Sequence, residues 1–194
     1  MTLIELMIAL VLGLLVSSAA LALVASIIKS NTETIRATRL TQELRSTAEV
    51  IAREIRRARS DKDPIINIGS PTTLLTACNA IDTSTAGCVT YGYDCTDPTA
   101  GTFKAIGLAN NAAGNGEVYL KALPTGAPTC PTNTDQLISS GAVKITGMTF
   151  APNPVTDVVT LSLTGQFASD GAGTLAPLTR SITQEIRIRS PQVQ

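Results

Sequence analysis

An uncharged apolar run near the beginning of the chain constrains its fold more than any other feature. The run extends from Leu6 to Ile28, contains no proline and one glycine, Gly13, and is bounded by Glu5 and Lys29. Its length of roughly 23 residues is enough to cross the hydrocarbon core of a bilayer as one helix. We therefore predict that residues 1–28 form an apolar helix that lies in a membrane or in the core of a filament.

A single carboxylate, Glu5, stands at the start of this run, where an unpaired charge is costly in hydrocarbon. The α-amino group of Met1 lies four residues away, so a lone subunit offers Glu5 only its own terminus or the membrane interface. In a helical stack, Glu5 can pair with the Met1 ammonium of a neighbour, and a buried polar pair of this kind fixes helix register. A membrane anchor with an incidental glutamate is the alternative interpretation.

The stretch MTLIELMIAL resembles the mature N-terminus of type IV pilins and pseudopilins. The resemblance implies that prepilin peptidase has removed a short leader and methylated Met1, and that Met1 and Glu5 act in assembly. Phenylalanine is the more common first residue of the family, so Met1 departs from its pattern. The resemblance also suggests that the helix melts locally at Gly13, Ser17 and Ser18. Small residues that ease helix–helix contact are the alternative explanation.

Helical periodicity continues beyond the apolar run. Apolar residues recur at steps of three and four and form one stripe, made of Leu40, Leu44, Ala48, Ile51, Ile55 and Ala58. Acid–base pairs with helical spacing lie on the other faces, namely Glu33–Arg36, Glu49–Arg53 and Glu54–Arg57. We expect one helix from near Thr2 to about Arg59, amphipathic over residues 29–60, ending before Asp63-Pro64.

The remainder, residues 61–194, is rich in turn residues and short apolar alternations that are typical of strands. The clearest expected strands are Ala142–Phe150, with a bulge near Gly147, Asp157–Phe167 and Arg180–Arg189. Weaker candidates are Thr73–Ala77, Cys88–Tyr93, Thr102–Leu108 and Glu117–Leu123. The predicted fold class is α+β. In this fold, a long N-terminal helix has its apolar half protruding and its amphipathic half packed on a mostly antiparallel sheet, as in the pilin fold.

All four cysteines, Cys78, Cys88, Cys95 and Cys130, lie beyond the apolar run. An even number in an exported domain predicts two disulfides. Their spacings of ten, seven and thirty-five residues do not match a zinc knuckle. Of the three possible connectivities, we favour Cys78 with Cys88 and Cys95 with Cys130.

The composition argues against catalysis. The chain contains no histidine, which removes Ser-His-Asp and Cys-His mechanisms and histidine-ligated zinc or haem. It also lacks a phosphate-binding loop. We expect no enzyme activity, no metal and no cofactor. The arginine-rich end of the helix could suggest nucleic acid or lipid headgroups. Interleaved glutamates and the lack of an aromatic platform favour a helix face that contacts partner subunits instead, with no specific nucleic acid.

A looser similarity connects the later part of the chain to PilW-like minor pilins and to the J-type pseudopilins of type II secretion. It rests on residues 51–58, on residues 88–91 and on the closing segment Ile182–Arg189. The cysteine pair that frames the C-terminal loop of many major pilins is missing, because Cys130 is the last cysteine.

These features predict a structural subunit of a type IV pilus, anchored in the bacterial inner membrane before assembly and extracellular afterwards. Its disulfide-bonded β domain would be periplasmic or extracellular. Its partners would be further copies and other pilin-like subunits, and the resemblance adds prepilin peptidase and an assembly ATPase with its membrane platform. The alternatives are a minor pilin that primes assembly, a J-type pseudopilin and, from another class, a membrane-tethered binding module. Scattered aspartates form no D-x-D calcium loop that would favour a pseudopilin.

Overall fold

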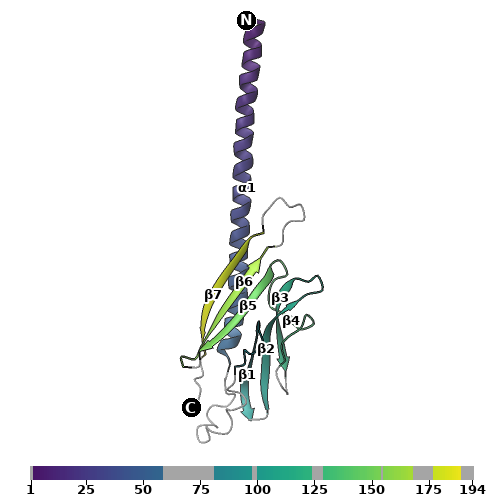
Figure 1. Cartoon of the computed structure of the whole chain (residues 1–194), viewed down its shortest axis with the longest axis vertical. Helices are drawn as coiled ribbons and strands as arrows, with labels where there is room; N and C mark the ends of the chain where they lie inside the picture. The colour runs from purple at the N-terminus through teal and green to yellow at the C-terminus, as the bar shows by residue number, and fades with distance from the viewer. Residues whose placement is uncertain are drawn as a thin grey trace. The chain divides into compact units, whose positions relative to one another are not determined.

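The computed structural model describes residues 2–58, 81–97, 100–123, 129–153, 155–167 and 177–188 (Figure 1). The chain divides into two compact units, Met1–Arg39 and Leu40–Gln194. One helix, α1 (Leu3–Arg56), contributes residues to both units, and Arg57 and Ala58 form the turn that follows it. The predicted long helix is therefore confirmed, with an end about three residues before the expected one.

In the first unit, α1 exposes its apolar surface along the whole predicted run. Large apolar side chains from Leu3 to Ile28 are between 51% and 81% exposed. By length and composition this helix could cross a membrane. The helix is regular at Gly13 and Ser17, and the Ser18 hydroxyl donates to the carbonyl oxygen of Leu15 at 2.9 Å.

In the second unit, the predicted stripe of α1 is the centre of the hydrophobic core. All six of its members are at most 1% exposed: Leu40, Leu44, Ala48, Ile51, Ile55 and Ala58. Thr47 and Ala52 are buried beside them. Because the stripe is buried along one face while charged residues occupy the other, this half of α1 is held by packing on the strands.

Seven strands form two antiparallel sheets in the second unit, which confirms the α+β class but divides the expected sheet into two. The first sheet has the order β1 (Cys88–Asp97), β2 (Ala100–Asn110), β3 (Gly116–Leu123) and β4 (Gln136–Leu137). The second has the order β5 (Lys144–Asn153), β6 (Val158–Gln166) and β7 (Thr179–Arg187). The two-residue β4 was not expected, because it is too short to show an alternating pattern. The expected strand Thr73–Ala77 lies outside the described residues.

The bulge expected near Gly147 is present in β5. Ile145 pairs with Gly165 of β6, whereas Gly147 pairs with the adjacent Thr164, so Thr146 is the extra residue. The insertion reverses which side chains face inward, and both Ile145 before it and Met148 after it are buried. The change of parity visible in the sequence is therefore the consequence of a bulge.

The two sheets meet along β5, which contacts β1, β2 and β3. Gly116 is essential to this contact, because a Cβ atom at that position would collide with the carbonyl oxygen of Ile145. Gly87 lies near the carbonyl oxygen of Met148 in the same way. The first sheet therefore covers one edge of the second sheet, and β7 forms the other edge (Figure 1).

Candidate functional site

Glu5, the predicted assembly residue, closes the first turn of its own helix. The backbone N–H of Thr2 donates to Glu5 Oε2 at 3.1 Å, and α1 begins at the next residue, Leu3. Thr2 therefore occupies the N-cap position, and Glu5 makes the glutamate half of a capping box. The motif T-x-x-E was visible in the sequence as Thr2-Leu3-Ile4-Glu5, but our sequence reasoning considered the charge of Glu5 and not its capping role.

This geometry leaves Glu5 able to bind a second donor. Only Oε2 accepts the Thr2 N–H, the Glu5 side chain is exposed, and an ionised carboxylate has two oxygens with several acceptor sites. A carboxylate in the first turn is also favoured by the helix dipole. Met1 lies outside the described residues, so its methylation and its pairing with Glu5 stay predictions.

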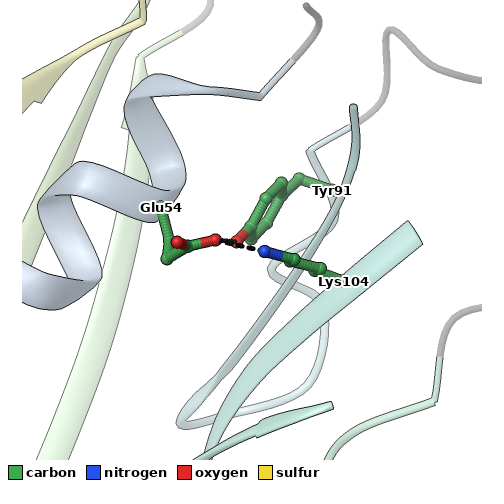
Figure 2. A network of polar contacts seen from close by, with 3 residues as sticks. All are labelled: Glu54, Tyr91 and Lys104. Atoms are coloured by element: carbon green, nitrogen blue, oxygen red, sulfur yellow. Dashed lines mark hydrogen bonds and ion pairs between the residues drawn. The ribbon is translucent and has the colours of Figure 1, made fainter. Parts of the chain in front are cut away.

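At the other end of α1, Glu54 joins the helix to the first sheet (Figure 2). Its Oε2 accepts from Lys104 Nζ of β2 at 2.6 Å and from the Tyr91 hydroxyl of β1 at 3.4 Å. The side chains of Lys104 and Glu54 are only 13% and 17% exposed. We expected a helical partner, Arg57, for Glu54, but its ion pair comes from a strand. We call Glu54, Tyr91 and Lys104 the helix–sheet clamp.

Cations and tyrosine rings extend the clamp. Lys104 Nζ lies 4.7 Å from the centre of the Tyr93 ring, and the Arg57 guanidinium lies 5.4 Å from it, both within the range of a cation–π interaction. Burial, followed by the charge and hydrogen bond of Glu54, raises the pKa of Tyr91 well above its usual value. The phenol therefore stays protonated and can keep donating to Glu54. The clamp has the properties of a structural joint.

A second polar cluster closes the β2–β3 hairpin. Glu117 is 7% exposed and accepts from Asn111 Nδ2 and from the Tyr119 hydroxyl, each at 2.7 Å. The hydrogen bond to Glu117, with burial as a smaller cause, raises the pKa of Tyr119. Asn111 Oδ1 also accepts two backbone N–H groups of the turn. These bonds fix the hairpin, and sequence reasoning did not find them because their partners come together only after the strands pair.

The cysteine pairing differs from the expected one. Cys88 is bonded to Cys130, with Cα atoms 6.0 Å apart, so both Cys78–Cys88 and Cys95–Cys130 are wrong. The reason lies in β2, where Gly107 pairs with Cys88 and leaves room for Pro131. This places the segment that carries Cys130 beside the start of β1. Cys78 and the Cys95 side chain lie outside what the structure describes.

The described residues contain no group of three or more His, Cys, Asp or Glu side chains that could hold a metal ion. The predicted helical pair Glu49–Arg53 is also not formed there. Glu5, the clamp and the disulfide are thus the sites for which the described structure gives a geometry. The absence of catalysis stays an expectation.

Comparison with known families gives one match. A family model described as prepilin peptidase-dependent protein B matches residues 33–188. No curated protein and no solved structure matches the chain. The matched span begins after the apolar run, so it is independent of the MTLIEL motif. It contains the second half of α1 and all seven strands.

Proposed function

Because the chain belongs to the prepilin peptidase-dependent protein B family, we propose that it is a structural subunit of a type IV pilus filament. The family links it to the prepilin peptidase-dependent pilus or pseudopilus system. Within that system, a subunit is the role that agrees best with an apolar N-terminal helix followed by a strand-rich domain without a recognisable catalytic group.

The exposed apolar surface of α1 carries this proposal. Large apolar side chains from Leu3 to Ile28 are more than half exposed, and burying each one contributes about 1.5–3 kcal/mol. So much apolar surface requires a cover, which lipid provides before assembly and neighbouring helices provide in a filament. Transfer from lipid to a helix bundle exchanges one apolar environment for another, so polar pairs such as Glu5 with a neighbour's N-terminus set the register.

The proposal names partners and a location. The partners are further copies of the chain and other pilin-like subunits, with prepilin peptidase, an assembly ATPase and its membrane platform acting on them. The chain is in the inner membrane before assembly and in an extracellular filament afterwards. It acts without catalysis, cofactor or metal, because its contribution is contact surface.

A minor pilin that primes assembly, or a J-type pseudopilin, is the second candidate. The family match covers the segments on which the similarity to those proteins rests, residues 51–58 and 88–91 and most of Ile182–Arg189. The two candidates differ in abundance, because a pilus subunit forms the bulk of a filament and a priming subunit is rare.

The test is a quantitative count of subunits. Surface filaments are sheared from cells, and this chain is weighed against other pilin-like chains by mass spectrometry, including its N-terminal peptide. A dominant chain with a methylated Met1 supports the main proposal, and a trace amount at filament ends supports the minor pilin. Finding the chain in neither filaments nor the cell envelope would overturn both.

A further inference from the structure

A groove in the second unit lies between α1 and the edge strand β7. It has a volume of about 330 Å³ and is lined by Arg45, Glu49, Ile182, Thr183 and Gln184. Arg45, Glu49 and Thr183 are exposed, and the other two side chains are half-buried. The lining has no aromatic ring and no buried charge, so it lacks the features of a small-molecule pocket. An open groove of this kind fits a macromolecular contact.

The strand on one side of the groove has a free edge. β7 pairs only with β6 among the described strands, whereas the opposite edge of that sheet, β5, is covered by the first sheet. An edge strand presents backbone N–H and C=O groups that can bind another chain. The free edge is therefore on the side of the sheet where the groove lies.

The helix on the other side of the groove presents two opposite charges. Arg45 and Glu49 are four residues apart, which places them on the same face of α1. In the described part of the chain, neither side chain forms an ion pair or a hydrogen bond. A face that carries both signs complements a partner that also carries both, and an identical face satisfies this condition.

We infer that this groove is a contact surface for a second copy of the chain, in which Glu49 of one copy pairs with Arg45 of the next. The inference rests on the proposed function and names the surface through which subunits meet outside the apolar core. Arg45 is assigned because it lines the groove, whereas Arg53, the other neighbour of Glu49 on the helix, does not. A polyanion is a poorer occupant, because Glu49 would repel it.

Charge reversal tests the pairing in cells that assemble filaments. Glu49→Arg should lower the amount of this chain in sheared filaments roughly tenfold or more, because like charges then face each other across the contact. The double variant Arg45→Glu/Glu49→Arg should restore the amount, since the pair is exchanged. Glu185→Arg is the matched control, because Glu185 is exposed on β7 but does not line the groove. Normal filaments from Glu49→Arg would overturn the pairing.

A photo-crosslinking residue at Thr183 tests the surface without changing its charge. We expect an adduct of twice the chain mass, with the second site mapping to α1 or β7 of another copy, and no such adduct from the exposed control position Thr149 of β5. An adduct with a different protein, or none in filaments that contain the chain, would overturn the inference but leave the proposed function intact. Absence of the unmodified chain from filaments and envelope would overturn the proposed function and this inference together.

Discussion

Glu54 of α1 and Lys104 of β2 are separated by fifty residues in the sequence, and their side chains form an ion pair of 2.6 Å between Oε2 and Nζ. The pair is largely shielded from water, with Tyr91 donating to the same oxygen. Its position at the end of the helix makes it the joint between α1 and the first sheet. The first predictions below follow from this joint.

Removing Lys104 should weaken the domain. In Lys104→Met, Glu54 keeps only the Tyr91 hydrogen bond, and leaving a shielded carboxylate underpaired should lower the free energy of unfolding by about 1–3 kcal/mol. Urea denaturation of the full chain in detergent measures this change. The double variant Glu54→Gln/Lys104→Met should cost less than the sum of the single changes. Additive losses would mean that the two residues are not coupled.

Tyr91 should make stability sensitive to alkaline pH. Its pKa is raised in the folded chain, so above about pH 10 the unfolded chain loses the phenolic proton and the folded chain retains it. The folded state then binds more protons, and the free energy of unfolding should fall as pH increases. Tyr91→Phe should make this decrease less steep, whereas Tyr93→Phe should leave the contribution of Tyr91 unchanged. Phenolate absorbance, which should show a late-ionising tyrosine only in the native chain, provides the direct check.

The close contact of Gly165 with Leu44 should make β6 intolerant of side chains at this point. A Cβ atom on Gly165 would lie 2.7 Å from Leu44 Cδ2 and 3.1 Å from Val143 Cγ1. Gly165→Ala should therefore lower the free energy of unfolding by about 1–3 kcal/mol through overpacking. In a Leu44→Ala background the same change should cost less, because space is available. An equal cost in both backgrounds would show that Leu44 is not the obstacle.

The disulfide should be found between Cys88 and Cys130. Digestion without reduction should release the two cysteines in one linked peptide, and Cys88→Ala and Cys130→Ala should destabilise the domain equally, by about 2–5 kcal/mol. Combining them should add little, because each single change already breaks the same bond. A linked peptide that joins Cys88 to Cys78 would contradict the pairing.

Glu5 variants should separate the capping role from the charge. Glu5→Gln keeps an oxygen that can accept the Thr2 N–H, since glutamine also serves in a capping box, but it removes the charge. If pairing with a neighbour's N-terminus sets the register, Glu5→Gln should lower filament incorporation roughly tenfold or more while leaving membrane insertion unchanged. Glu5→Ala should show the same loss. Normal incorporation of Glu5→Gln would mean that capping, and not charge, is what assembly requires.

Much of the fold was visible in the sequence because local periodicity encodes it. The stripe from Leu40 to Ala58 predicted the buried face of α1, and the change of parity around Gly147 predicted the bulge in β5. The separation into two sheets was not visible, because it depends on Gly116 meeting the Ile145 carbonyl across the chain. A glycine in the sequence does not say what will approach it.

The sequence by itself determined the apolar helix, the α+β class and the position of Glu5, since hydrophobic spacing and a short motif act locally. Only the tertiary structure decided that Glu54 pairs with Lys104, that Cys88 bonds to Cys130 and that Arg45 and Glu49 line an open groove beside β7. Each of these depends on strand order and register, which bring distant residues together. Side chains far apart in the chain compete for the same partner, and packing selects among them.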